Sequence, residues 1–348
     1  MPKNKHLVIL TPGFPLNETE SNFVTSIQLF VQEFHDNTSY KVSIISYRHP
    51  CDKGIYFWNG IPVHTFKKPH SFFLRPIKWW TIFRTLLQIH RNHPIDVIQS
   101  FWLSQSAALG YWFTKYYKIK HFTTLLGQDV LPNNKYAYML PLSKMNLISV
   151  SENQQKLMLQ NFKTQTRLVP LGITENPCVD QFDKTIDIIG LGSFIPLKNF
   201  ELFIEVIFEI NKTKPLKVVL VGDGILRQRL EQKTKELQLE AVIEFLGCLT
   251  YKETLCKLAQ SKILLHPSQY EGFGMVFPEA LQAKSMIVSQ DVGCALASNN
   301  WKIANTKTQM TEACLALLDQ NFDDSQPKPL QISEMTQLYL SLYSNENI

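Results

Sequence analysis

The sequence predicts an α/β protein with two doubly wound domains, each built on a parallel sheet covered by helices. Short apolar runs alternate with longer amphipathic stretches along the chain, which is the pattern of parallel strands joined by helices. The runs form two sets, separated at Pro170-Leu-Gly172, and each set is long enough for one such domain. With 348 residues and 45% hydrophobic composition, the chain can fill two cores. We therefore expect domains at 1–170 and 171–330.

The expected elements follow from these apolar runs and the stretches between them. In the first domain the expected strands are His6–Leu10, Val42–Ser46, Val63–Phe66, Val97–Gln99, His121–Leu125 and Leu147–Val150, with helices at Asn22–Phe34, Pro76–His90 and Gln105–Tyr117. In the second the expected strands are Ile186–Gly190, Lys217–Val221, Ile243–Leu246, Ile263–Leu265 and Met286–Ser289, with helices at Phe200–Ile210 and Leu226–Leu237. A polar, proline-bearing linker, Asp319–Pro329, precedes a final helix at Gln331–Tyr343.

The segment His266–Ala283 carries the strongest functional signal. An apolar strand ends at its first residue, and a glycine loop, Glu271-Gly-Phe-Gly274, follows. Pro278 favours the first turn of a helix, so Glu279 falls in that turn. Free N–H groups at a helix start bind an anion, and two carboxylates beside them accept hydrogen bonds from hydroxyls. This combination predicts a nucleotide-sugar site. The simpler interpretation is a capping glutamate near an unrelated loop acid.

The stretch Glu271–Glu279, E-G-F-G-M-V-F-P-E, resembles the donor-site signature of retaining glycosyltransferases of the GT-B fold, family 4. The resemblance covers most of the chain and is strongest from 186 to 293. It implies two Rossmann-like domains facing each other across a cleft, an N-terminal acceptor domain and a C-terminal donor domain, with a final helix (331–345) that packs back on the first. It also implies a hexosyltransferase that moves a sugar from a nucleotide-sugar donor with retention of configuration and without a metal or other cofactor. The acceptor it implies is a glycan or a lipid-linked intermediate of cell-surface polysaccharide synthesis.

The resemblance assigns the chemistry to residues around this loop. Lys198 matches the lysine that binds the donor diphosphate, and a lysine is a compact charge suited to a departing phosphate. Glu271 is expected to orient the sugar hydroxyls, and Glu279 to accept hydrogen bonds from the ribose. The expected catalytic residues are therefore Glu271 and Lys198; the alternative for Lys198 is a solvated loop lysine. The loop residues expected around the diphosphate are Gly272, Phe273, Gly274, Met275 and Val276.

Other turns give further donor-side candidates. Gly222-Asp-Gly224 ends a strand and opens a helix as in the family, where an arginine follows, and Arg227 or Arg229 takes that place here. The alternative is a tight turn with an aspartate as helix cap. Leu246-Gly247 matches the position where backbone groups meet the nucleotide base. The donor-binding candidates from these turns are Gly222, Asp223, Gly224, Leu246 and Gly247, together with Ser193 and Gly13.

Three positions depart from the family pattern. Ser193 stands where an arginine is usual, Leu126 where a histidine or arginine is frequent, and Ser21 where a loop glycine is usual. Gly127 and Asp129 nevertheless match a G-x-D segment on the acceptor side. The departures keep open a catalytically degenerate binding subunit of the GT-B fold. A sugar-nucleotide epimerase, which would use the donor site alone, is the other alternative.

Basic residues concentrate in the first half of the chain. Residues 1–170 hold 19 Lys and Arg against 8 Asp and Glu, whereas the remainder holds 16 against 22. Residues 53–95 contain no acid and mix basic with aromatic side chains, which suits an anionic membrane surface. The alternatives are single-stranded nucleic acid and a plain core face, made by Ile77, Trp80, Phe83 and Leu87. No nucleic-acid motif is present, so nucleic acid is not expected as a partner. The expected membrane-contact residues are Lys67, Lys68, Arg75, Lys78, Trp79 and Arg84.

Three features bear on location. The six cysteines are scattered without a C-x-x-C pair or a zinc-type cluster. The N-terminal apolar stretch is too short for a signal peptide, and no apolar run is long enough to span a bilayer. These features predict reduced thiols and a cytoplasmic protein. The basic and aromatic segment adds the expectation of a peripheral position on the cytoplasmic face of the membrane.

Overall fold

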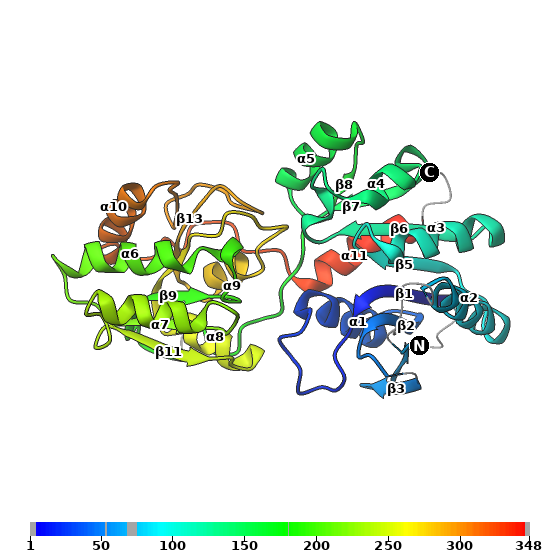
Figure 1. Ribbon diagram of the computed structural model, residues 1–348, viewed down its shortest axis with the longest axis horizontal. Helices are drawn as coiled ribbons and strands as arrows, with labels where there is room; N and C mark the ends of the chain where they lie inside the picture. Colours follow the sequence, from blue (N-terminus) through cyan, green and yellow to red (C-terminus); the bar gives the residue numbers. More distant parts are fainter. Residues whose placement is uncertain (1–4, 53, 68–74, 180, 345–348) are drawn as a thin grey trace. The chain divides into compact units, whose positions relative to one another are not determined.

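The computed structural model describes residues 5–52, 54–67, 75–179 and 181–344, which separate into two compact units (Figure 1). Unit 1 comprises the residues up to Gly172 together with those from Gln331, and unit 2 comprises Ile173–Leu330. Each unit has its own sheet with helices on both faces. The predicted fold class, two doubly wound α/β domains, is confirmed.

Unit 1 is built on an eight-stranded sheet with the order β3-β4-β2-β1-β5-β6-β7-β8. Every neighbouring pair is parallel except β3 and β4. The strands are β1 (Lys5–Gly13), β2 (Tyr40–His49), β3 (Gly54–Trp58), β4 (Ile61–Thr65), β5 (Val97–Phe101), β6 (Lys120–Leu125), β7 (Asn146–Ser149) and β8 (Arg167–Leu168). The helices are α1 (Thr25–Asn37), α2 (Arg75–Asn92), α3 (Gln105–Tyr117), α4 (Lys135–Met139), α5 (Glu152–Phe162) and α11 (Ile332–Ser344). The chain runs from β1 through β2 to the edge strand β3 and its neighbour β4, and then returns to β5 on the other side of β1. The strand order therefore reverses between β1 and β5. Ligands of such sheets bind beyond the carboxyl ends of the strands at this switch point.

The last helix of the chain, α11, is part of the core of unit 1. The Tyr343 hydroxyl donates to Gln99 Oε1 at 2.9 Å, and the hydroxyls of Tyr339 and Thr124 lie 2.8 Å apart. The Tyr339 ring packs edge-on against Phe30 of α1. These buried contacts join the end of the chain to β5, β6 and α1, so removing α11 would expose side chains of these elements that are now buried.

Unit 2 is built on a parallel six-stranded sheet with the order β11-β10-β9-β12-β13-β14. Its strands are β9 (Ile186–Leu191), β10 (Val218–Val221), β11 (Ile243–Gly247), β12 (Ser261–His266), β13 (Met286–Ser289) and β14 (Trp301–Ile303). Its helices are α6 (Phe200–Asn211), α7 (Arg227–Glu236), α8 (Tyr251–Ala259), α9 (Val276–Gln282) and α10 (Lys307–Leu318). The switch point lies between β9 and β12.

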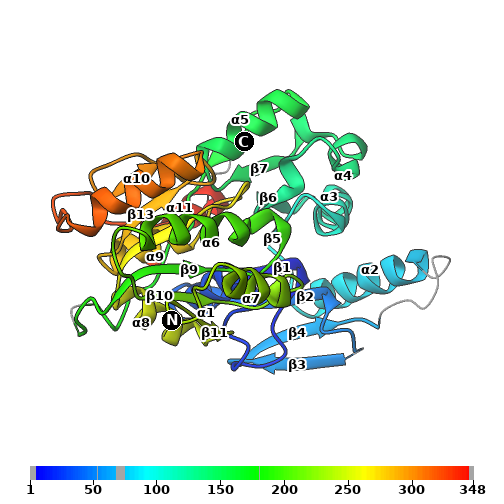
Figure 2. The same ribbon diagram turned by 60° about the vertical axis from the view of Figure 1, so that its left-hand side comes forward.

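Alternate residues of the unit 2 strands bury against different helices, as expected for a parallel sheet covered on both faces. Ile188 packs with α6, α7 and α10, whereas its neighbour Ile189 packs with α8 and α9. Figure 2 shows these helices around the strands of unit 2. Helix α6 forms because Phe203, Ile207 and Ile210 recur at helical spacing and place one apolar stripe on the sheet. The loops at the carboxyl edge of this sheet therefore start from strands that are packed on both faces.

Some predictions about the chain were wrong or incomplete. The first helix begins at Thr25 rather than Asn22, and α5, α8 and α10 were not predicted. Cys178 and Cys256 form a disulfide, so the prediction that all six cysteines are free thiols is wrong for this pair. Asn176 brings the two segments together, because its side chain accepts from Cys178 N and donates to Leu255 O. None of the helices in the described ranges has the length and apolarity that crossing a bilayer requires.

Candidate active site

The two predicted catalytic residues of unit 2 lie against each other, although 73 positions separate them in sequence. Lys198 follows β9 and Glu271 follows β12, and these are the neighbouring strands at the switch point. Lys198 Nζ lies 2.5 Å from Glu271 Oε1. His266, the last residue of β12, places Nε2 2.6 Å from the same oxygen. The fold thus joins a cation, a carboxylate and an imidazole at the carboxyl edge of the sheet.

The protonation states in this cluster follow from burial and pairing. Burial by itself would raise the pKa of Glu271, but the His266 hydrogen bond and the Lys198 charge outweigh it and lower that pKa to about 2. Burial lowers the pKa of His266, so its neutral ring donates Nε2–H to the carboxylate. Glu271 is therefore a fixed carboxylate, oriented by two donors before any ligand arrives.

Glu279, unlike Glu271, has no cation among the partners described for it. It lies in the first turn of α9 and is 6% exposed. Burial raises the pKa of Glu279 to about 8, and the Tyr251 hydroxyl donates to its Oε1 at 3.0 Å. The two glutamates of the E-x7-E motif therefore differ in charge at neutral pH. Glu271 is ionised and Glu279 is mostly protonated until something stabilises its carboxylate.

The glycine loop Glu271–Gly274 is held in place by backbone contacts. Gly274 adopts φ 83°, and a Cβ there would lie 2.5 Å from the Phe277 ring. Gly293 adopts φ 62°, which lets its backbone approach Phe273 O, and Cys294 N donates to that oxygen at 2.8 Å. The predicted loop residues Gly272, Phe273, Gly274, Met275 and Val276 thus form one connected turn that leads into α9.

The Gly222–Gly224 turn packs against the loop after β9. A Cβ on Gly222 would lie 2.0 Å from Gly192 O, and one on Gly224 would lie 2.6 Å from Phe194 O. Gly222 N donates to Gly247 O at 2.9 Å, so the turn also connects to the end of β11. These contacts hold the loop that carries Ser193 beside the turns at Gly222 and Gly247.

The Asp223 side chain has local partners in this turn. Its carboxylate accepts from Gly224 N at 2.7 Å and pairs with Arg227 Nη1 at 3.2 Å. Arg227 also lies 3.4 Å from the position of a Cβ on Gly247, whereas Arg229 pairs with Glu201 on α6. Of the two arginines considered from the sequence, Arg227 is the one beside the predicted donor turns.

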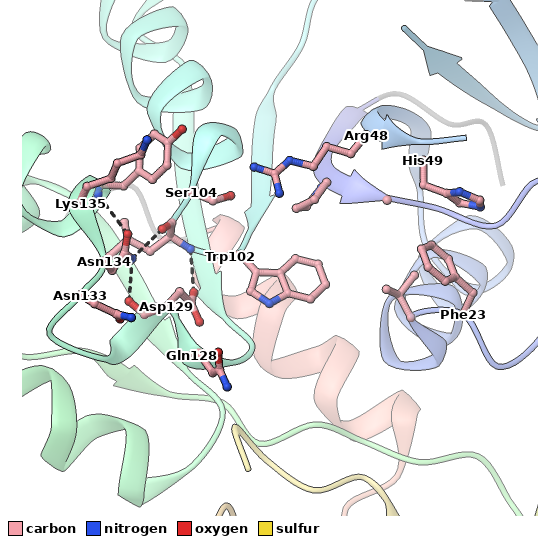
Figure 3. Close-up of a pocket in the computed structure, with 15 residues that line it drawn as sticks. Phe23, Arg48, His49, Trp102, Ser104, Gln128, Asp129, Asn133, Asn134 and Lys135 are labelled. Atoms are coloured by element: carbon pink, nitrogen blue, oxygen red, sulfur yellow. Dashed lines mark hydrogen bonds between the residues drawn. The ribbon is translucent and has the colours of Figure 1, made fainter. Parts of the chain in front are cut away.

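Unit 1 contains a cavity of about 670 Å³ at the carboxyl ends of β1, β2 and β5 (Figure 3). The predicted residues Gly13 and Asp129 line it. Arg48, Trp102 and Lys135 also line it, and sequence reasoning missed them because each is a single residue outside any motif. Their only sequence signal is position, since Arg48 lies at the end of one strand and Trp102 directly follows another.

Asp129 is half-buried in the wall of this cavity and fixes the loops around it. Its carboxylate accepts from Leu103 N at 2.7 Å and from Gly127 N at 2.8 Å. Burial raises the pKa of Asp129 to about 6. Asn134 reinforces the arrangement by donating to Leu103 O and Asp129 O. Asp129 therefore joins the loops after β5 and β6.

The residues predicted to contact a membrane are distributed unevenly over unit 1. Lys68 lies outside the described residues, as does the side chain of Arg75. Lys67 and Arg84 are exposed, while Lys78 is half-buried and burial lowers its pKa. Trp79 packs against the core cluster of α2 and α3. The core-face alternative was wrong for Ile77 and Trp80, which are 59% and 61% exposed; the buried face of α2 consists of Ile82, Leu86 and Ile89.

Comparisons with known proteins agree with this arrangement. The family model for glycosyl transferases group 1 matches residues 177–300. An uncharacterized glycosyltransferase of Methanocaldococcus jannaschii is 26% identical over 59% of this chain and 58% of its own length. The 2-deoxystreptamine N-acetyl-D-glucosaminyltransferase of Niallia circulans is 29% identical over 30% of this chain and 28% of its own. The alignments with these two relatives thus span less than two thirds of either relative's length.

Solved structures show the same fold at low sequence identity. HepE of Anabaena, crystallised with UDP and glucose, has a TM-score of 0.68 and 15% identity, covering 97% of this chain and 95% of its own. Sucrose-phosphate synthase of Thermosynechococcus elongatus has a TM-score of 0.72 and 16% identity, covering 98% and 99%. The fold is GT-B, and residues 177–300 match the family model for glycosyl transferases group 1.

Proposed function

We propose that this protein transfers a sugar from a nucleotide-sugar donor to an acceptor, with retention of anomeric configuration. The observation that carries the proposal is the Lys198–Glu271–His266 cluster at the switch point of unit 2, within the stretch matched by the family model. The Anabaena relative in fold was crystallised with UDP and glucose, which supports a nucleotide-sugar donor here as well.

In the proposed reaction Lys198 stabilises the departing diphosphate. A preoriented cation at the edge of the sheet stabilises charge that develops on the leaving group, because it needs no rearrangement as the bond breaks. The backbone N–H groups of Gly274, Met275 and Val276 add donors beside it. Arg227, near Gly247, is a further cation on this side, although Asp223 and Glu231 already pair with it.

The two glutamates take different roles in this proposal. Glu271, held by His266 and Lys198, accepts hydrogen bonds from the hydroxyls of the transferred sugar. Glu279, next to the Tyr251 hydroxyl, accepts from the ribose hydroxyls. No protein nucleophile is assigned, so retention rests on attack by the acceptor on the same face from which the diphosphate leaves.

A donor screen tests this function. Thermal shift with a panel of nucleoside diphosphates and nucleotide sugars should reveal one preferred base, and mass spectrometry should then detect a glycosylated acceptor. Donor binding without any transferred product would favour the degenerate binding subunit. Conversion of the nucleotide sugar into an isomer of equal mass, without an acceptor, would favour the epimerase.

We expect the activity to survive chelation. Lys198 and the loop N–H groups supply the positive charge for the diphosphate, so no divalent ion is assigned a role. Turnover in excess EDTA should equal turnover without it, since the proposed site is made of protein groups alone. Loss of activity with EDTA that Mn²⁺ or Mg²⁺ restores would contradict this donor-site model.

We also propose that unit 1 binds an anionic membrane surface and that the acceptor is a membrane-bound or lipid-linked glycan. On α2 and α3 the side chains of Trp80, Trp112 and Tyr116 are 61%, 55% and 77% exposed. Ring contacts connect the two helices, since Phe83 beside Trp80 packs on Phe113 at 5.3 Å. Exposed basic residues accompany these aromatics: Arg84, Lys115 and Lys118.

Names of relatives point to such acceptors. One is the poly(ribitol-phosphate) alpha-N-acetylglucosaminyltransferase of Staphylococcus aureus, 26% identical over 43% of this chain and 31% of its own length. Another, from Campylobacter jejuni, acts on an undecaprenol-linked glycan and is 30% identical over 38% of each chain. Cell-surface polysaccharide synthesis at the cytoplasmic face of the membrane is the setting we propose.

Cosedimentation with vesicles tests the membrane surface. Wild type should pellet with anionic vesicles at low salt and be released at high salt, because each basic residue near such a surface contributes about 1 kcal/mol. The triple variant Arg84/Lys115/Lys118→Ser should lose most of this binding, and Trp80→Ser should weaken it. Lys252→Ser, an exposed lysine of unit 2, is the control and should bind as wild type. Failure of wild type to pellet at low salt would contradict the proposal.

A further inference from the structure

The cavity of unit 1 lies where a doubly wound sheet binds its ligand. It opens at the carboxyl ends of β1 and β5, the two strands between which the strand order reverses. Its volume, about 670 Å³, is within the range of small-molecule sites.

Trp102 contributes the indole ring to the apolar lining of the cavity. It adopts φ 64°, a left-handed conformation that a bulky side chain rarely takes. The surroundings hold it there, because Trp102 N donates to Thr124 O at 2.8 Å and the next residue is fixed by Asp129. Such strained residues cluster at functional sites.

The Trp102 indole projects into the cavity (Figure 3). Gly127 allows this position, since a Cβ on Gly127 would lie 3.3 Å from the indole Nε1. A flat aromatic face exposed in a cavity fits the C–H face of a pyranose ring, which is the apolar side of a sugar. The ring therefore provides a platform on which a sugar can stack.

Arg48 gives the cavity its charge. Figure 3 shows its guanidinium extending from the end of β2 towards Trp102 and Ser104. Among the described residues, no carboxylate pairs with it within 4.0 Å. A fork of N–H donors of this kind matches a carboxylate or phosphate.

The other charged groups at the cavity do not cancel Arg48. Lys135 adds a second cation at the opposite wall. His49 lies 3.5 Å from Glu20, so that acid already has a partner, and the Asp129 carboxylate is occupied by two backbone N–H groups. The cavity is therefore electropositive beside an aromatic platform.

We propose that this cavity binds a pyranose that carries a phosphate or carboxylate group, with the ring stacked on Trp102 and the anionic group held by Arg48. The role of this cavity as the acceptor site rests on the proposed function. Its binding of an anionic sugar does not depend on that function. The two anions share the same chemistry at Arg48, so the experiment includes both.

Calorimetric titration of the full chain tests the inference, with glucose 6-phosphate, glucuronate, glucose and inorganic phosphate as probes. At least one of the two anionic sugars should bind tenfold or more tightly than either glucose or phosphate alone. The stronger of the two identifies the anion. Three results would overturn the proposal. Glucose could bind as tightly as both anionic sugars, inorganic phosphate could bind as tightly as both anionic sugars, or no sugar could bind.

Variants assign the binding to the two residues. Arg48→Gln should reduce affinity for the anionic sugar to that for glucose, while Arg91→Gln, an exposed arginine of α2, should not change it. Trp102→Asn removes the ring with a residue that tolerates positive φ, and it should abolish binding of the sugar. Retained anionic selectivity in Arg48→Gln, or retained sugar affinity in Trp102→Asn, would contradict the assignment.

A further variant separates this inference from the donor site. Lys198→Ala should bind the anionic sugar as wild type does, because Lys198 belongs to unit 2. If the anionic sugar instead loses affinity in Lys198→Ala, it binds at the donor site and the inference fails. A donor screen that fails while this titration succeeds would refute the proposed function and leave the cavity assignment intact.

Discussion

Replacing Lys198 with alanine is expected to reduce kcat by about 10²–10³-fold, the scale found when one preoriented group that stabilises transition-state charge is removed. The effect should fall on kcat as well as on donor affinity, because neutralisation of the diphosphate matters most as the leaving group departs. Glu271 should remain in place through His266 Nε2, which lies 2.6 Å from it. Steady-state kinetics with the donor found in the screen measures both parameters.

Lys262→Ala is the matched control for this variant. Lys262 is also a half-buried lysine of unit 2 in an ion pair, 2.9 Å from Asp187, and it lies at the start of β12, at the opposite end from His266. Its loss should leave kcat within about twofold of wild type, since surface ion pairs contribute little. Wild-type turnover in a folded Lys198→Ala would show that Lys198 is a loop lysine without a catalytic role.

Replacing Glu279 with glutamine is expected to weaken binding of the cognate nucleoside diphosphate by about 1–3 kcal/mol, the scale of a hydrogen bond to a charged group. Burial raises the pKa of Glu279 to about 8, so the free protein must ionise this carboxyl to offer its full acceptor strength. Wild-type affinity should therefore rise between pH 6 and 8, and that of Glu279→Gln should not. Calorimetry across this range gives both results, and unchanged affinity in the variant would reject the ribose role.

Whereas nucleotide affinity should rise with pH, the contribution of Glu279 to stability should fall as the pH rises. Between about pH 4.5, the ordinary value for this carboxyl, and pH 8, Glu279 is protonated in the folded state but ionised in the unfolded state. Folding then binds a proton. Each unit by which the pH rises within that window therefore lowers the free energy of unfolding by about 1.4 kcal/mol through this group. Glu279→Gln should lose this contribution, as measured by urea unfolding. Glu240→Gln, an exposed residue of the same unit, should retain it.

The fold was predictable because the spacing of apolar residues within short segments of this chain indicates strands and helices. Fully buried runs such as Val218–Val221 identified central parallel strands, and the break at Gly172 separated the two sets. The missed elements include two helices of ordinary length, α5 and α10, as well as shorter ones. Helix α8 has nine residues and depends on a capping box, Thr250 with Glu253, for its start. That box was a usable signal, whereas β14, with three residues, is a strand only through its pairing with β13.

The sequence predicted residues of the candidate site but not how they are arranged. The motif named Lys198 and Glu271, but their contact arises because β9 and β12 are neighbours at the switch point. His266 was read as the end of a strand, and its bond to Glu271 depends on burial that one sequence does not reveal. Arg48 and Trp102 share a cavity through the order of β1, β2 and β5, which topology alone determines.

Proton NMR of the complete reaction tests the central claim most directly, since it observes the donor sugar, the product and the configuration of the new bond together. With the donor from the screen and a phosphate- or carboxylate-bearing glycan as acceptor, the anomeric signal of the donor should decay as a glycoside of the same configuration appears. Lys198→Ala should slow both changes equally. A product of inverted configuration, or a donor signal that persists with every acceptor, would contradict the account.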